Sequence, residues 1–231
     1  MLKELGKCAV FRARTVAELT GASPAYARLV LQRLAKAGQV LRIGRDAYTV
    51  HRDAFLVASR MAWPSYISVW SALRYHNLTE QVPHAVWVVT ARKRRAEVRF
   101  ADTLIMFIRT KPRLLFGYGK VDYRGFEVFM ADPEKAVIDS LLFRRVSVSE
   151  MFGILKANIR TLNVGRLVGY AVKTGNGALI RRLGYMLDRL GRDTHRRLKK
   201  YVYPTPVALD YSLPAGGPVN GKWKVRENVR L

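Results

Sequence analysis

Cysteine and histidine are both scarce in this chain, and their scarcity argues against several classes of function. Cys8 is the only cysteine in 231 residues, so an intrachain disulfide is excluded. The histidines are scattered, without the spacing of a metal-ligand set, at positions 51, 76, 84 and 195. Nothing in the sequence places one of them beside a nucleophile, and there is no Gly-rich phosphate loop. We therefore expect no metal site, no cofactor and no catalytic residue, and we predict that the protein is not an enzyme.

Long apolar segments are missing as well. No stretch is long and apolar enough to span a bilayer, and none has the pattern of a basic amphipathic anchor. The first eleven residues lack the apolar region and small-residue cleavage site of a signal peptide. The sequence thus predicts a cytoplasmic protein without a membrane partner.

Acidic residues are few: 17 Asp and Glu stand against 41 Lys and Arg, a formal net charge of +24. The excess is spread along the chain, with 11 cations against 4 anions in residues 1–60, 14 against 8 in 61–146, and 16 against 5 in 147–231. So basic a protein repels itself unless an anionic partner neutralises it, and nucleic acid is the usual partner. A solubility device or a generally basic proteome is the alternative interpretation.

The segment from Ser23 to Gly38 has the signature of a well-delimited helix. Ser23 is a preferred N-cap, Pro24 suits the first helical position, and Gly38 can take the left-handed conformation that ends a helix. Apolar residues recur with helical spacing on one face, at Ala27, Val30, Leu31 and Leu34. The opposite face carries three cations and an amide, which is the pattern of a helix that lies against a polyanion.

The neighbouring segments predict a helix-turn-helix with a following hairpin. Residues 2–5 suggest a short first helix, and Thr15 and Glu18 have the spacing of a capping box that starts a second one. Val16 and Leu19 would face inward, and Gly21 would make the turn into the Ser23 helix. Two short strands, residues 40–43 and 47–50, flank a turn. We therefore predict a winged helix-turn-helix DNA-binding domain over residues 1–58.

This prediction assigns roles to individual side chains. Arg28, Gln32 and Arg33 would read base edges in the major groove, where Arg prefers guanine and Gln adenine. The full base-reading set is Ala25, Tyr26, Arg28, Leu29, Gln32, Arg33 and Lys36. A second set would hold phosphates at the helix ends and the wing, namely Arg12, Arg14, Thr15, Ser23, Arg42 and Arg45.

Residues 59–231 have the pattern of a mixed α+β domain, so the whole chain is predicted to be of the α+β class. Residues 51–63 and 66–76 look helical, whereas 85–90 form an apolar run typical of a buried strand. Further strands are predicted at 97–100, 104–109, 114–116 and 127–130. Asp132 and Ser147 would cap two helices, the chain would stay helical to about residue 200, and a last strand is predicted at 223–225.

Two charged segments in this second part have more than one interpretation. Arg92, Lys93, Arg94 and Arg95 form a second basic patch that either contacts phosphate or is a solvated loop. Asp132, Glu134 and Lys135 resemble a nuclease carboxylate–lysine set. Such sites need the carboxylate and lysine on one face of a strand, whereas these residues open a helix. We therefore interpret them as capping residues.

Three segments together resemble a known family. After the predicted winged helix come PSYISVWSALRYHNLTEQVPH at residues 64–84, AVWVVT at 85–90 and ADPEKAVIDSLL at 131–142. This combination, which covers most of the chain, resembles the AbiEi-type antitoxins and transcriptional regulators of antiviral defence. The resemblance implies a repressor encoded beside a nucleotidyltransferase toxin, which binds inverted repeats in the shared promoter through the winged helix, with a dimer on DNA as one arrangement. It further implies a second domain that relieves toxicity without a stable complex with the toxin.

Some alternatives stay open at this point. This chain is more basic and shorter than the resemblance implies, which leaves a solitary regulator as an alternative to an antitoxin. A nonspecific, chromatin-like DNA or RNA binder would use the spread of positive charge instead of base readout. A nucleic-acid enzyme with an unrecognised site is the third interpretation.

Overall fold

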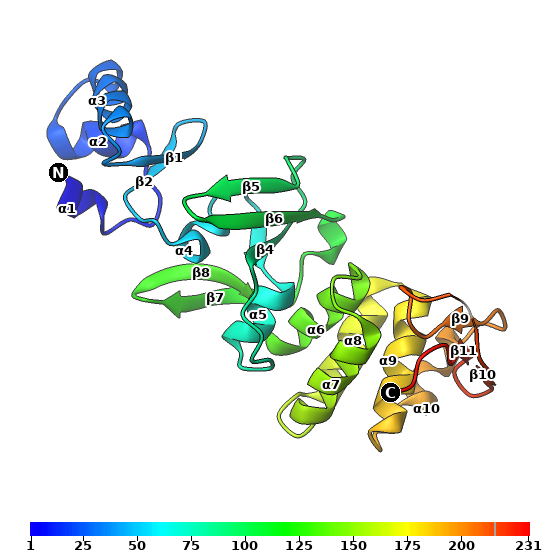
Figure 1. Cartoon of the computed structure of the whole chain (residues 1–231). Coiled ribbons are helices and arrows are strands. Elements are labelled where there is room, and N and C mark those ends of the chain that lie inside the picture. The colour runs from blue at the N-terminus through cyan, green and yellow to red at the C-terminus, as the bar shows by residue number, and fades with distance from the viewer. Residues whose placement is uncertain (215) are drawn as a thin grey trace. The chain divides into compact units, whose positions relative to one another are not determined.

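The computed structural model describes residues 1–214 and 216–231, and it is a mixed α+β protein. The chain divides into two compact units. Figure 1 labels the helices and strands. The first unit comprises Met1–Ile67, His84–Pro112 and Gly119–Met130. The second comprises Ser68–Pro83, Arg113–Tyr118 and Ala131–Leu231.

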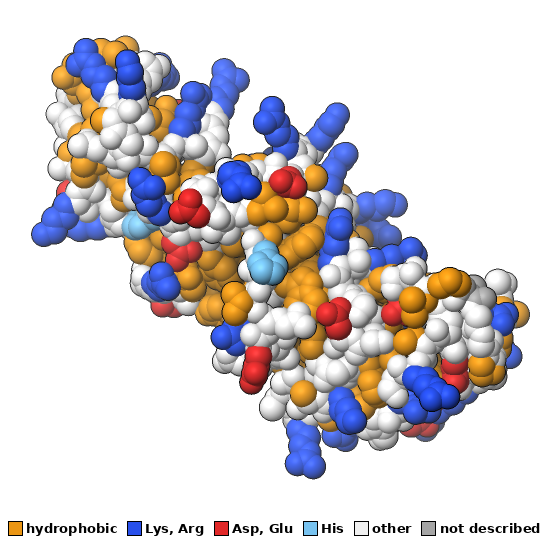
Figure 2. All heavy atoms as spheres, viewed as in Figure 1, with side chains coloured by type: hydrophobic (Ala, Val, Ile, Leu, Met, Phe, Trp, Pro, Cys, Tyr) orange, Lys and Arg blue, Asp and Glu red, His pale blue; other side chains and the backbone are white. Residues whose placement is uncertain are grey.

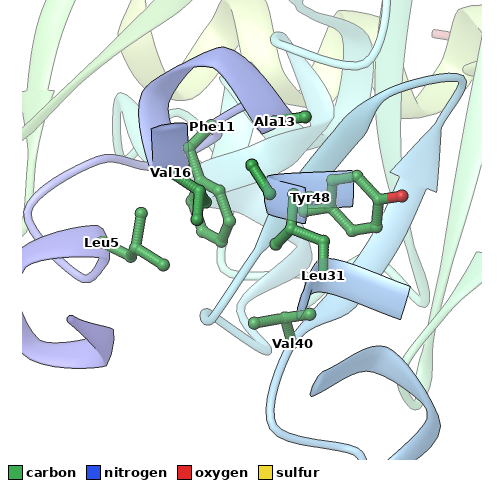
Figure 3. Close-up of a cluster of buried hydrophobic side chains, with 8 residues drawn as sticks. Leu5, Phe11, Ala13, Val16, Leu31, Val40 and Tyr48 are labelled. Atoms are coloured by element: carbon green, nitrogen blue, oxygen red, sulfur yellow. The ribbon is translucent and has the colours of Figure 1, made fainter. Parts of the chain in front are cut away.

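The N-terminal part of the first unit consists of three helices and a hairpin around one small core. The elements are α1 (Leu2–Leu5), α2 (Ala13–Thr20), α3 (Pro24–Lys36), β1 (Leu41–Gly44) and β2 (Ala47–Thr49). Figure 3 shows side chains from these helices and the hairpin converging in this core, which contains Leu5, Phe11, Ala13, Val16, Ala27, Leu31, Val40 and Tyr48. Because α3 and the hairpin share one core, their exposed faces are held in a fixed relation.

Local backbone chemistry sets the connections in this region. Gly21 adopts φ +67°, the left-handed conformation that ends α2 and turns the chain toward α3. The hairpin pairs Leu41 with Thr49, and Asp46 in its turn has φ +51°. One detail of the sequence prediction is wrong: Leu19 is 48% exposed and does not face the core.

Besides α4 (Ala54–Ala58), the rest of the first unit consists mainly of a six-stranded mixed sheet in the order β5-β6-β4-β3-β8-β7. Its strands are β3 (Ser65–Ile67), β4 (Ala85–Thr90), β5 (Glu97–Phe100), β6 (Thr103–Arg109), β7 (Tyr118–Tyr123) and β8 (Phe126–Ala131). β4 runs parallel to β6 and antiparallel to β3. The predicted apolar strand at 85–90 is confirmed as the largely buried β4.

Two predicted helices are shorter in the structure than expected. Residues 66–76 were expected to be one helix, but Ser65–Ile67 form β3, and only α5 (Val69–Tyr75) is helical. β3 lies between β4 and β8, so pairing with distant strands outweighs the helical spacing of its apolar residues. Of residues 51–63, only α4 (Ala54–Ala58) is α-helical, and the Asp53 carboxylate accepts the Phe55 N–H at 2.9 Å to cap it.

The strand predicted at 114–116 is also wrong, because the chain there forms the 3₁₀ helix η1 (Pro112–Leu114) and then a loop. Strand β7 was not predicted. It joins β8 through a tight turn in which Arg124 and Gly125 both have positive φ, at +54° and +81°. Two consecutive positive-φ residues are typical of a hairpin turn, and the Gly at this position was the available signal.

The second unit is mainly helical. Besides α5 and η1 it contains α6 (Pro133–Leu142), α7 (Val148–Asn158), α8 (Val164–Thr174), α9 (Gly177–Arg189), α10 (His195–Leu198) and η2 (Lys199–Tyr201). The predicted caps are confirmed, since Asp132 accepts the Lys135 N–H and Ser147 forms a capping box with Glu150. Three two-residue strands follow: β9 (Val207–Ala208), β10 (Val219–Asn220) and β11 (Val225–Arg226). The last strand therefore begins two residues later than the predicted start at 223.

Within the described residues, no helix has the length and apolarity needed to cross a membrane.

Candidate nucleic-acid interface

The N-terminus of α3 is built as its sequence predicts. The Ser23 hydroxyl accepts the Tyr26 N–H at 3.3 Å, and Pro24 occupies the first turn, where no intrahelical donor is needed. At the other end Gly38 has φ +69° just beyond the helix. The limits of this helix therefore follow from residues within the segment itself.

The side chains predicted to read bases all lie on the open face of α3. Ala27 and Leu31 are completely buried and fasten the opposite face to the core. Two apolar members of the predicted set are notably exposed: Tyr26 at 54% and Leu29 at 41%. The complete set is exposed, namely Ala25, Tyr26, Arg28, Leu29, Gln32, Arg33 and Lys36. Of the predicted core residues of α3, Val30 and Leu34 are only half-buried, and Leu34 packs against the core.

The predicted phosphate contacts at α2 are arranged differently from the expectation. The capping box of Thr15 and Glu18 is wrong, because the helix begins at Ala13 with Arg12 as its N-cap. Thr15 is the third helical residue, and its hydroxyl accepts the Arg12 N–H at 3.4 Å. Arg14 is exposed but forms an ion pair with Glu18 at 2.7 Å, so its charge is partly neutralised.

The hairpin presents its two arginines to solvent and is tied to α2. Arg42 and Arg45 are both exposed, and the Arg42 Nε–H donates to the Gly44 carbonyl at 3.2 Å. The Asp46 carboxylate accepts the Ala13 N–H at 3.3 Å. This bond caps α2 from outside the helix and links the hairpin turn to its first residue. Figure 2 shows Lys and Arg side chains prominent on the visible surface, where Asp and Glu are few.

The second basic patch divides into two kinds of residue. Lys93 and Arg95 are exposed, whereas Arg94 packs its guanidinium 3.6 Å from the centre of the Phe107 ring and donates to the Met61 carbonyl at 2.7 Å. Burial lowers the pKa of Arg94. Arg92 donates to the Trp63 carbonyl at 2.8 Å. Of the four, Arg94 serves packing, and this segment is not part of the core shared by α3 and the hairpin.

The Asp132–Lys135 segment is structural, as its capping interpretation predicts. The Asp132 carboxylate caps α6 and also accepts the Tyr170 hydroxyl at 2.6 Å. Burial and this neighbouring carboxylate raise the pKa of Tyr170 to about 12.

The two buried charges that follow Asp132 are paired within the protein. Glu134 accepts the Asn163 N–H at 2.8 Å and pairs with Arg166 at 3.2 Å. Lys135 is fully buried and pairs with Asp139, whose other oxygen accepts the Ser68 hydroxyl at 2.8 Å. Among the described residues, no group of three or more His, Cys, Asp or Glu side chains is arranged to hold a metal ion.

Comparison of the chain with models of known protein families gives no match, and comparison with curated proteins gives none either.

Proposed function

We propose that α1–α3 and the β1–β2 hairpin act as a winged helix-turn-helix and that the protein is a sequence-specific, DNA-binding transcriptional regulator. The proposal rests on one observation above all: α3 is fastened by Ala27 and Leu31 while every side chain assigned to base reading is exposed. A rigid helix with Arg and Gln on its open face suits the major groove, whose base edges these side chains recognise.

The individual roles follow from the chemistry of each side chain. Arg28, Gln32 and Arg33 contact base edges, and Leu29 contacts thymine methyl groups. Arg12 holds a phosphate beside the helix, and Arg42 and Arg45 do so at the hairpin. Arg14 contributes less than the others because Glu18 already neutralises part of its charge.

The resemblance to AbiEi-type regulators extends this proposal to autoregulation. The protein then binds inverted repeats in its own promoter, with a dimer on DNA as one arrangement, and counteracts a nucleotidyltransferase toxin encoded beside it without a stable complex. Expression of the neighbouring gene with and without this protein tests that extension: growth arrest that only co-expression relieves supports it, and no growth arrest contradicts it.

The decisive experiment compares two DNA duplexes, the region upstream of the gene and a scrambled sequence of equal composition, over a range of salt concentrations. Base readout keeps the native duplex bound at about 200 mM salt, where purely ionic binding to the scrambled duplex has weakened by orders of magnitude. Coincident curves at every salt concentration would contradict sequence-specific autoregulation.

A second candidate function is nonspecific nucleic-acid binding by the second unit. The observation that favours it is a run of exposed cations around α10 and η2, namely Arg192, Arg196, Arg197, Lys199 and Lys200. This function predicts a steep salt dependence with no preference between the two duplexes. The same titration therefore separates the two candidates.

A further inference from the structure

A cavity of about 390 Å³ lies within the first unit, away from the open face of α3. Its walls come from three segments: the chain just before α2, the loop between α4 and β3, and strands β7 and β8. This volume falls within the range of small-molecule sites in proteins. None of the residues assigned to base reading lines it.

One wall of the cavity is aromatic. Trp63 and Phe129 both line it, with ring centres 4.8 Å apart and planes inclined at 55°. Although it packs against Phe129, Trp63 remains 57% exposed, so part of its indole surface is open to a ligand. The Trp63 carbonyl accepts the Arg92 Nε–H at 2.8 Å, so the backbone that carries the indole is held in place.

The remaining wall is cationic. Arg12, Arg60 and Lys120 line the cavity together with a single carboxylate, Glu127, which pairs with Lys120 at 2.9 Å. Arg60 donates to the Glu127 backbone carbonyl at 2.8 Å and lies 5.7 Å from the centre of the Phe129 ring. Across the described residues, no carboxylate pairs with Arg12 or Arg60. Two guanidinium groups are therefore available to an anion.

A second hollow of about 290 Å³ shares Arg60 and Glu127 with the first. Cys8, Gly125 and Phe126 are among its lining residues. Arg60 thus lines both hollows, so a ligand larger than one aromatic ring can extend along it.

We propose that this pocket binds a nucleotide, with the base stacked on Trp63 and the phosphate held by Arg12 and Arg60. An exposed indole is a suitable stacking surface for any base, and guanidinium groups match phosphate oxygens with paired N–H donors. The ligand chemistry is a base that carries a phosphate, whether as a free mononucleotide or as an unpaired nucleotide of a strand. None of the base-reading residues of α3 lines this site, but it shares Arg12 with the proposed DNA phosphate contacts. Trp63 and Arg60 belong to the pocket alone, so variants at these two positions test it whether or not the proposed function holds.

The test measures binding to the full-length protein by calorimetry at low salt. The probes are AMP and UMP, with adenosine and inorganic phosphate as controls for the separate halves of the ligand. A short single-stranded oligothymidylate and a perfectly paired duplex distinguish a strand from a free nucleotide. We expect AMP or the single strand to bind at least about tenfold more tightly than adenosine or phosphate.

Variants connect this binding to the pocket. Trp63→Ala should weaken it about tenfold, the order expected for loss of one stacking contact, whereas Trp63→Phe should retain most of it. Arg60→Ala should weaken it by a similar factor. Tyr203→Ala and Arg99→Ala remove a comparably exposed aromatic and an exposed arginine elsewhere, and they should change nothing. Thermal melts confirm that each variant is folded.

The outcomes separate cleanly. If AMP or UMP binds more tightly than adenosine and phosphate, and this binding depends on Trp63, the ligand is a free nucleotide. If only the single strand shows binding that depends on Trp63, the ligand is a nucleotide within a strand. Three results would overturn the proposal. The first is inorganic phosphate that binds as tightly as the nucleotides and the single strand, and the second is a protein that binds neither nucleotides nor the single strand. The third is Trp63→Ala and Arg60→Ala variants that bind these ligands as tightly as the wild type does.

Discussion

Helices α3 and α6 begin with the same kind of cap, but the charged side chains of α3 are exposed and those of α6 are buried. Each has a polar N-cap followed by proline, Ser23–Pro24 in α3 and Asp132–Pro133 in α6. The cations of α3 are exposed, whereas α6 buries Glu134, Lys135 and Asp139. Because a buried charge needs a partner, those of α6 are all occupied within the protein. The charged side chains of α6 are therefore engaged within the protein, whereas those of α3 are exposed to solvent.

The largest effect should come from separating the buried pair in α6. Asp139→Ala leaves the Lys135 ammonium buried without its carboxylate, and we expect the free energy of unfolding to fall by about 3–5 kcal/mol. Chemical denaturation followed by circular dichroism measures this loss. The double variant Lys135→Met with Asp139→Leu should recover much of it, since apolar side chains of similar size can replace a buried pair. A single variant as stable as the wild type would show that the pair is not needed.

Removal of an exposed cation from α3 should leave stability unchanged and alter DNA binding instead. Under the proposed function, Arg28→Ala weakens binding to the promoter duplex by about 1–3 kcal/mol, concentrated at one base position. Its free energy of unfolding should change by no more than about 0.5 kcal/mol. Competition assays with single-base variants of the duplex measure the first effect. An equal loss on every sequence would assign Arg28 to a phosphate.

Loss of the N-cap should lower stability less in α3 than in α6. Ser23→Ala removes one bond to the Tyr26 N–H and should cost about 1 kcal/mol of stability, while Ser23→Asp should preserve the cap. Asp132→Ala should cost more, because its carboxylate also accepts the Tyr170 hydroxyl. Denaturation of the three variants side by side tests the ranking. Equal losses for the two alanine variants would argue against a contribution from Tyr170.

The smallest effects should distinguish neighbours in the second basic patch. Lys93→Ala should leave stability within about 0.5 kcal/mol of the wild type, because this side chain is exposed. If it contacts phosphate, the variant reduces the slope of log affinity against log salt by about 1. Arg94→Ala should instead lower stability by about 1 kcal/mol, through loss of its bond to the Met61 carbonyl. Identical behaviour of the two variants would contradict this division.

Much of the candidate interface could be predicted because it is local. The limits of α3 depend on Ser23, Pro24 and Gly38, all within or beside the helix, and its open face follows from helical spacing. The start of α2 could not be predicted in this way. The Asp46 carboxylate, 33 residues beyond Ala13, accepts the first N–H of this helix. No sequence pattern near Thr15 predicts that contact.

The sequence by itself determined the strong excess of positive charge, the absence of an intrachain disulfide, the mixed α+β class and the capped helices α3, α6 and α7. These features depend on composition or on residues within about one helical turn of each other. Only the tertiary structure decided that Ser65–Ile67 form a strand, that Arg94 packs on Phe107, and that Trp63 and Arg60 line one cavity. Strand pairing, burial and cavities arise between residues far apart in the chain, so the spacing of neighbouring residues does not predict them.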